Sequence, residues 1–253
     1  MSAPVFLAPA AAFAAVGDVL ELDGDEARHA VTVQRRRIGE VVDLVDGAGL
    51  RARGPIVSTG DRSLAIRVEA VSRDDDPPLT LVQALAKGGR DEQALESATE
   101  LGATRIVPWA ADRSIVQWRG AKADKARGQW ESLARAAAKQ SRRATVPAVA
   151  PVATTRQLAG LVRDAVAAGE RVLVLHEESA APLTALTWDD ARQGVWCIVG
   201  PEGGISDAEV AALTEAGAEP VLLGPHVLRA SSAGPAAFAA LAACRGTWNT
   251  LGA

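Results

Sequence analysis

An α/β fold with a parallel sheet, preceded by a small and mostly β domain, is predicted for this chain of 253 residues. Three observations predict it. A charged run that ends in two prolines, Arg73 to Pro78, separates two regions rich in patterned apolar residues. Short strand-like segments precede this run, whereas strands alternate with helices after it, as parallel sheets with crossovers require. Two glycine turns, Gly200–Gly204 and Gly224, each follow an apolar strand near the C-terminus.

The region before the charged run consists of short segments of alternating polarity between turn residues. The expected strands are Val19–Leu22, Val41–Val45 and Leu64–Val71, and one helix is expected over Glu26–Arg35. We therefore assign residues 1–72 to a β domain, 73–79 to a linker and 80–253 to the α/β domain.

The region after the run alternates between apolar strands and helical periods. The expected strands are Leu79–Leu85, Arg105–Val107 (stopped by Pro108), Val172–Leu175, Val195–Val199 and Val221–Leu223. The expected helices are Asp91–Leu101, Asp124–Ser141, Ser206–Ala216 and Ser232–Cys244. Ser206 and Glu209 have the spacing of a capping box, and Ser231 and Ser232 are expected to cap the last helix.

Charge is unevenly distributed along the chain. The formal net charge is −4, yet the stretch from Arg105 to Arg143 holds ten Lys or Arg against three Asp or Glu. A basic surface on an acidic protein is typical of a local polyanion site, and a solvated helix face is the alternative.

The other composition features bound the compartment and the cofactors. Cys197 and Cys244 lie in apolar segments, so both are expected to be buried free thiols in a reducing compartment. The three histidines have no ligand spacing, and no metal is expected. No apolar stretch reaches transmembrane length, and we expect a cytoplasmic protein.

The loops after the last strands are expected to form a pocket for a flat, polar small molecule. A dinucleotide fingerprint is absent from the first βα turn, and no Gly-Lys-Ser/Thr follows Gly200, so both common nucleotide folds are disfavoured. Side-chain-free backbone at a strand end lets a ligand approach main-chain N–H and C=O groups. The expected pocket segments are Leu175–Glu177, Gly200–Gly204 and Leu223–Arg229.

Several ordered motifs resemble one family. Val199-Gly200-Pro201-Glu202-Gly203-Gly204-Ile205-Ser206, followed by Leu223-Gly224-Pro225-His226-Val227-Leu228-Arg229, is similar to the signature of the RsmE family, SPOUT methyltransferases that act on uridine N3 of 16S ribosomal RNA. Ala98–Gly102, Arg113–Trp118 and Lys139–Arg143 resemble further family segments in the right order. His29–Val33 and Asp46–Gly49 resemble its PUA-like RNA-binding domain, a small β-barrel.

This resemblance implies a C-terminal trefoil knot, a homodimer and bound S-adenosylmethionine, without a metal. The residues implied for cofactor binding are Leu175, His176, Glu177, Gly200, Pro201, Glu202, Gly203, Leu223, Gly224 and Leu228. Those expected to bind RNA are Arg35, Arg36, Arg37, Arg113, Lys139, Arg142 and Arg143.

The implied reaction requires a group that handles the proton on uridine N3 or the charge that develops there. Arg229 is the candidate for stabilising charge on the uracil oxygens, and the alternative is that it fixes the turn through backbone carbonyls. Glu202 is either a base or a structural residue of the turn. His176 and His226 are weaker candidates for the base.

Three departures from the family pattern accompany these matches. Ser231 and Ser232 replace a Glu-Thr pair, Ser97 replaces a lysine of the first helix, and an N-terminal arginine is missing. Two rival functions stay open: methylation of an RNA ribose 2′-hydroxyl, and a catalytically silent RNA-binding or ribosome-assembly factor.

Overall fold

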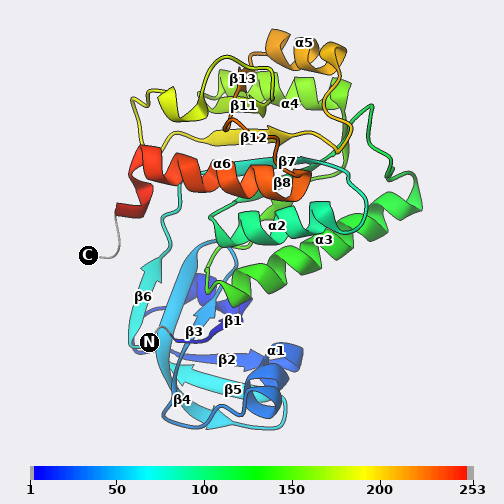
Figure 1. Ribbon diagram of the computed structural model, residues 1–253. Helices are drawn as coiled ribbons and strands as arrows, with labels where there is room; N and C mark the ends of the chain where they lie inside the picture. The colour runs from blue at the N-terminus through cyan, green and yellow to red at the C-terminus, as the bar shows by residue number, and fades with distance from the viewer. Residues whose placement is uncertain (1–2, 250–253) are drawn as a thin grey trace. The chain divides into compact units, whose positions relative to one another are not determined.

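The computed structural model describes residues 3–249, and the chain divides into two compact units (Figure 1). The first unit joins Met1–Asp75 to Arg135–Val146, and the second joins Asp76–Ala134 to Pro147–Ala253. The long helix α3 (Ala121–Gln140) therefore contributes residues to both units. That division within a helix has no counterpart in the boundaries 1–72, 73–79 and 80–253 expected from the sequence.

The first unit is built on a six-stranded sheet with strand order β1-β3-β4-β5-β2, in which β6 also pairs with β4. Its strands are β1 (Val5–Leu7), β2 (Val19–Asp23), β3 (Val41–Val45), β4 (Leu50–Thr59), β5 (Ser63–Arg67) and β6 (Ala70–Arg73). Its short helical segments are η1 (Pro9–Phe13), α1 (Gly24–Arg28) and η2 (His29–Val33). Alternating residues of these strands form one apolar core around Phe6, Leu44 and Ile66, so the predicted mostly β unit is confirmed.

Two elements of the first unit differ from the sequence-based prediction. The single strand expected over Leu64–Val71 is two strands, β5 and β6, which pair with different parts of β4 on either side of Gly54. The helix expected over Glu26–Arg35 ends earlier, because a π turn follows α1 and Arg35 adopts a left-handed φ of 54°. The long strand β4 was not expected at all.

The second unit contains a seven-stranded, fully parallel sheet in the order β10-β8-β7-β12-β11-β13, with β9 also paired to β8. Its strands are β7 (Leu79–Ala84), β8 (Arg105–Ala110), β9 (Ala148–Val149), β10 (Ala153–Thr154), β11 (Arg171–Leu175), β12 (Val195–Val199) and β13 (Glu219–Val221). Its helical elements besides α3 are α2 (Arg90–Glu100), α4 (Thr155–Ala167), η3 (Leu183–Ala185), α5 (Asp207–Glu215), α6 (Ala230–Arg245) and η4 (Thr247–Asn249).

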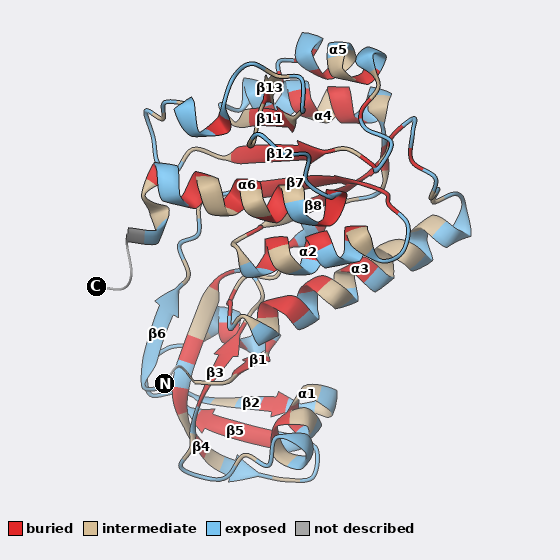
Figure 2. Cartoon of the chain, viewed as in Figure 1, coloured by how far each residue is buried: buried red, intermediate tan, exposed pale blue. Residues whose placement is uncertain are grey.

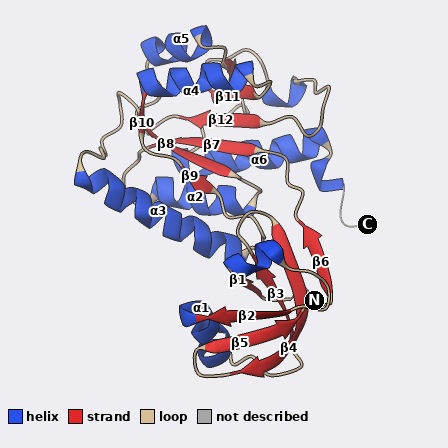
Figure 3. Cartoon of the chain, turned by 180° about the vertical axis from the view of Figure 1, so that it is seen from behind, coloured by secondary structure: helices blue, strands red, loops and turns tan. Residues whose placement is uncertain are grey.

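Helices cover both faces of this sheet (Figures 1 and 3). Helices α2 and α6 pack on one face, and α4 and α5 on the other. Trp196 and Ile198 of β12 pack toward Leu158 and Leu213 of α4 and α5. Every residue of β12 is consequently buried, as Figure 2 shows, and this explains why the strand is apolar throughout rather than alternating. The predicted α/β class with a parallel sheet is confirmed.

Two strands of the second unit have boundaries that the sequence did not indicate. Strand β8 continues through Pro108, which lies opposite the interval between the short edge strands β9 and β10, where no ladder N–H is needed. Strand β13 covers Glu219–Val221 rather than Val221–Leu223, because Leu222 leaves the ladder and bridges to Pro182 instead.

The structure also corrects three predictions, two about helices and one about a thiol. Helix α4 was missed, although Thr154 and Gln157 form a capping box at its start. The N-cap of α6 is Arg229, so Ser231 and Ser232 lie in its first turn and do not cap it. Cys197 is buried, and this burial raises the pKa of its thiol to about 12, but Cys244 is exposed.

Candidate functional site

The carboxyl ends of β11, β12 and β13 come together at one edge of the second unit's sheet, and two adjoining cavities lie there. The first cavity has a volume of about 240 Å³ and the second about 900 Å³. Both are lined by the residues that follow β11 and by the start of α6 and the segment before it. In open parallel sheets this edge is where ligands bind.

All ten residues predicted to bind a cofactor line these cavities. Leu175, His176, Glu177 and Leu228 line both, Leu223 and Gly224 line the first, and Gly200, Pro201, Glu202 and Gly203 line the second. Three segments that are distant in sequence therefore meet, as expected from the parallel topology. Their role in binding a cofactor stays a prediction.

The first cavity has a leucine-rich wall and an open glycine. A Cβ placed on Gly224 would have no atom within 4 Å, so it would project into free space. Leu175, Leu223 and Leu228 supply apolar surface beside it, and the main chain of Leu223–Pro225 supplies polar groups. An apolar slot edged by backbone donors and acceptors suits a flat heteroaromatic base.

The turn at Gly200–Gly204 is held closely by a neighbouring loop. Gly204 has a φ of +75°, a conformation that favours glycine, and its N–H donates to the carbonyl of Pro201 at 2.9 Å. Arg113 Nη1 donates to the Gly203 carbonyl at 3.0 Å. A Cβ on Gly203 would lie 3.1 Å from the Cβ of Arg113, so a larger residue at position 203 would displace Arg113 first.

Glu202 forms an ion pair with Arg90. Arg90 Nη1 lies 2.8 Å from Glu202 Oε1, which also accepts the N–H of Lys87 at 3.3 Å. Partial burial alone would raise the pKa of Glu202, but hydrogen bonds from its own backbone N–H, Arg90 and Lys87 lower it overall. A carboxylate with a lowered pKa is a weaker base, so these contacts favour the structural role of Glu202.

Arg90 is a site residue that the sequence reasoning missed. It opens α2 directly after Gly88 and Gly89, so the same signal that marked Gly203 and Gly204, a glycine pair after an apolar strand, also marks this loop. The neighbouring Asp91 is buried and accepts the N–H groups of Ala86 and Glu92 at 3.0 Å each. That burial raises the pKa of Asp91.

Two other arginines line the second cavity with no carboxylate partner. Arg113 and Arg229 form no ion pair within the described residues 3–249. Arg229 stands at the N-cap of α6, is exposed, and its side chain makes no hydrogen bond among those residues. The alternative in which Arg229 fixes the turn through backbone carbonyls therefore has no contact to support it in this part of the chain.

The two histidines considered as bases also lie at the cavities. His176 lines both, and its Nδ1 faces the N–H of Glu178 at 3.4 Å. His226 is exposed and lines the first cavity only. Neither histidine has a carboxylate partner among the described residues that would orient it as a base.

The remaining residues predicted to bind RNA belong to the first unit. Arg35 and Arg37 are exposed, whereas Arg36 pairs with Glu40 at 3.2 Å. Lys139 Nζ lies 2.7 Å from Glu26, and Arg143 is buried, which leaves Arg142 as the exposed arginine of its segment. The RNA-binding role of all these residues stays a prediction.

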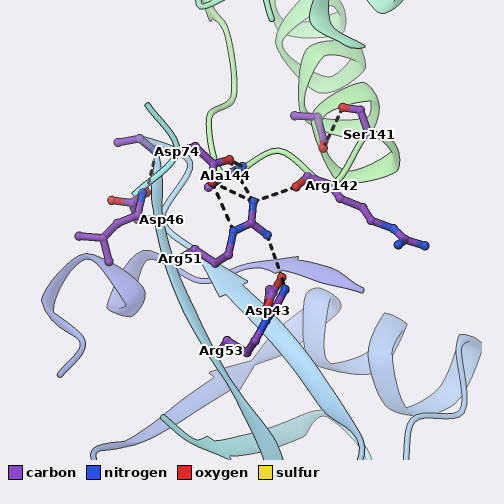
Figure 4. Close-up of polar contacts among 11 residues, drawn as sticks. Asp43, Asp46, Arg51, Arg53, Asp74, Ser141, Arg142 and Ala144 are labelled. Atoms are coloured by element: carbon purple, nitrogen blue, oxygen red, sulfur yellow. Dashed lines mark hydrogen bonds and ion pairs between the residues drawn. The ribbon is translucent and has the colours of Figure 1, made fainter. Parts of the chain in front are cut away.

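A carboxylate and arginine network fixes the segment of Arg142. Arg51 donates to Asp43 at 2.8 Å, to Asp74 at 3.0 Å and to the Arg142 carbonyl at 2.9 Å (Figure 4). Arg53 donates to the same Asp43 at 2.7 Å, and Asp43 is only 1 % exposed. Figure 4 shows the side chain of Arg142 leading away from this network, so its carbonyl is bound while its guanidinium points elsewhere.

Neither a membrane-spanning helix nor a metal cluster occurs within residues 3–249. No helix there is long and apolar enough to cross a bilayer. No group of three or more His, Cys, Asp or Glu side chains there is placed to hold a metal ion.

Comparison with known families matches both units. Residues 74–242 match the model of an RNA methyltransferase domain, and residues 22–69 match that of an RNA methyltransferase PUA domain. The ribosomal RNA small subunit methyltransferase E of Mycobacterium tuberculosis is 44% identical over 235 residues, which cover 92% of this chain and 89% of that protein. The protein of the same name from Bacillus subtilis is 31% identical over 84% of this chain and 85% of its own.

Solved structures agree with this match. A ribosomal RNA small subunit methyltransferase E from Neisseria gonorrhoeae, bound to S-adenosylmethionine, superposes with a TM-score of 0.83 at 28% identity and covers 96% of this chain and 98% of its own. A methyltransferase from Legionella pneumophila in complex with the same cofactor superposes with a TM-score of 0.76 at 26% identity, again over 96% and 98%.

Proposed function

Because this chain belongs to the family of ribosomal RNA small subunit methyltransferase E, we propose that it transfers a methyl group from S-adenosylmethionine to N3 of a uridine in 16S ribosomal RNA. The membership in an RNA methyltransferase family with a PUA domain, expected from the motifs, is confirmed. The choice of uridine N3 rests on the resemblance of the Gly200–Ser206 and Leu223–Arg229 motifs.

The observation that carries the proposal is the pair of cavities at the ends of β11, β12 and β13. Relatives with the same fold hold S-adenosylmethionine. In this chain the slot around Gly224 has free space and leucine walls for an adenine, with main-chain groups to read its polar edge. Glu177 and Glu178, on the rim of the larger cavity, suit the positively charged parts of the cofactor.

The chemistry follows from what the chain places around the larger cavity. Bound S-adenosylmethionine supplies an activated methyl group, so the protein must align the acceptor nitrogen with it. Arg229 has donors and a charge that no carboxylate in the described residues neutralises, so it can stabilise negative charge on a uracil oxygen as the N3 proton passes to solvent water. Glu202 forms an ion pair with Arg90, so it stabilises the turn and does not act as the base for the N3 proton.

Binding of the RNA would use phosphate contacts from the first unit, with the target uridine unstacked into the cavity. Of the arginines discussed, Arg35, Arg37 and Arg142 are exposed and best suited to phosphates. A homodimer, a trefoil knot at the C-terminus and a cytoplasmic location are further parts of this proposal, and they rest on the family resemblance.

Two measurements test the proposal together. Calorimetry with S-adenosylmethionine should give saturable binding, and small ribosomal subunits incubated with protein and cofactor should yield 3-methyluridine on digestion and mass spectrometry. A ribose-methylated nucleoside would instead support the 2′-hydroxyl alternative. Failure to bind the cofactor at millimolar concentration would support the silent assembly factor.

A further inference from the structure

One buried carboxylate, that of Glu209, joins three loops at the edge of the candidate site. Glu209 is 2 % exposed and lies in the first turn of α5. Its Oε1 accepts the N–H of Asp112 at 2.8 Å and the hydroxyl of Thr155 at 2.8 Å. Its Oε2 accepts the N–H of Ser206 at 3.0 Å and faces the Ser206 hydroxyl at 3.0 Å.

Two of the three loops so joined, those of Gly200–Ser206 and Arg113, contribute to the lining of the larger cavity. Ser206 closes the turn that begins at Gly200, Asp112 precedes Arg113, and Thr155 opens α4. The next residue after the Asp112 anchor, Arg113, donates to the Gly203 carbonyl and lines the cavity. Glu209 itself does not line either cavity, so it can affect a ligand only through these neighbours.

Three of the four donors around Glu209 have fixed directions, and the fourth is the Ser206 hydroxyl, which can rotate. Two of them are backbone N–H groups, which cannot reverse. The third, the Thr155 hydroxyl, accepts the indole N–H of the fully buried Trp109 at 3.2 Å, so its own proton points to Glu209. Each carboxylate oxygen therefore faces a donor that cannot turn away, and only a carboxylate supplies acceptors at both places.

We infer that Glu209 is a positioning residue for the cofactor site. Its carboxylate holds Arg113 against the Gly200–Ser206 turn. A capping box at α5 needs only the contacts to Ser206. The contacts to Asp112 and Thr155 exceed that need and lead directly to the loop that braces Gly203. This inference rests on the proposed function, because it assigns a role in holding S-adenosylmethionine.

Glu209→Gln is the sharpest test, because the amide keeps the size of the side chain but must direct its NH₂ at one of two fixed N–H donors. We expect the Kd for S-adenosylmethionine to rise about tenfold, as loss of one hydrogen bond to a charged group at a braced loop predicts. Glu215→Gln, on the exposed last turn of the same helix, is the matched control for the change in charge and should leave the Kd unchanged.

A double-mutant cycle separates positioning from simple stability. Arg113→Ala should also weaken the cofactor, and the double variant with Glu209→Gln should be no weaker than the worse single variant, since both act through one contact. Fully additive effects would overturn the inference. So would a Glu209→Gln protein that melts at a lower temperature but, while folded, binds the cofactor as the unsubstituted chain does.

A milder variant covers the case in which Glu209→Gln does not fold. Thr155→Val removes one donor to Glu209 and the acceptor of the Trp109 indole N–H while leaving the Asp112 and Ser206 contacts, and we expect the Kd to rise about threefold. An unchanged Kd in this variant would contradict the inference. If the unsubstituted chain itself binds no cofactor, the proposed function fails rather than the role of Glu209.

Discussion

Two pairs of arginines, Arg51 with Arg53 in the first unit and Arg113 with Arg229 in the second, serve opposite purposes in this protein. In the first unit Arg51 and Arg53 share the buried Asp43, and Arg51 also reaches Asp74, so their charges are neutralised within the fold. In the second unit Arg113 and Arg229 line a cavity and form no ion pair among the described residues.

The presence or absence of a carboxylate partner separates structural from functional arginines, where the sequence shows only positive charge. A neutralised guanidinium stabilises its own surroundings, and removing its partner leaves a poorly solvated charge behind. An unpaired guanidinium beside a cavity keeps its charge for a ligand.

Removing the carboxylate that Arg51 and Arg53 share should lower the stability of the first unit strongly. For Asp43→Asn we expect the free energy of unfolding to fall by about 3 kcal/mol, because two arginines lose a nearly buried partner. Urea denaturation measures this. The matched control is Asp25→Asn: Asp25 pairs with Arg62 at the surface, and its loss should cost about 0.5 kcal/mol or less. Equal losses in both variants would remove the distinction between the two kinds of arginine.

Removing the unpaired arginine should affect the reaction and spare the fold. For Arg229→Ala we expect kcat to fall about 100-fold, or about 2.7 kcal/mol, with an unchanged melting temperature and cofactor affinity. Arg229→Lys keeps a charge but loses the planar donor pair, so its loss of kcat should be smaller. A large drop in stability with unaltered kcat would place Arg229 with the structural arginines instead.

Reversing the charge of the exposed Arg142 should weaken RNA binding by about tenfold at low salt, and the loss should shrink as salt is raised. Its backbone carbonyl stays bound to Arg51, so the cofactor affinity should not change. Filter binding over a range of salt concentrations checks this, with Arg163→Glu on α4 as the matched exposed control. A loss independent of salt would argue against a phosphate contact.

The smallest expected effect is on the pH dependence of stability at acid pH. The pKa of Glu202 lies below its ordinary value of 4.5, so the stability contributed by its carboxylate is complete above 4.5 and is lost as pH falls through the lowered pKa. Arg90→Gln removes one cause of that lowering. It should move the acid loss of stability to higher pH, by an amount worth less than about 1 kcal/mol because the pair is partly exposed. Identical acid profiles would show that Arg90 does not tune Glu202.

Local patterns in the sequence were enough to predict several features of the structure. The fully apolar run Val195–Val199 predicted a buried strand, and β12 is one. The spacing of Ser206 and Glu209 predicted a capping box, which is present. The glycine turns after the strands predicted where the cavity would be, because parallel strands bring their carboxyl ends to one edge.

Features that depend on distant contacts were missed or misplaced. Helix α4 was missed although local signals mark both its ends, the Thr154–Gln157 capping box at its start and Gly169, with a φ of 84°, just after its last turn. The expected caps at Ser231 and Ser232 failed because α6 begins earlier, at Ala230. Pro108 lies inside a strand because neither β9 nor β10 pairs with it, so its missing N–H leaves no hydrogen bond unmade. Strand pairing decides this, and local propensity does not.

The fold class, the order of most strands and helices and the glycine turns of the site follow from the amino-acid sequence, since they depend on periodicity and backbone freedom within a few residues. Which charged residues are neutralised and which face a cavity depends instead on how the chain folds. Asp43 and Arg51, Glu202 and Arg90, and Glu209 and Asp112 meet across 8 to 112 positions of sequence. Electrostatic and hydrogen-bond partners are chosen by distance in space, and that distance exists only once the chain has folded.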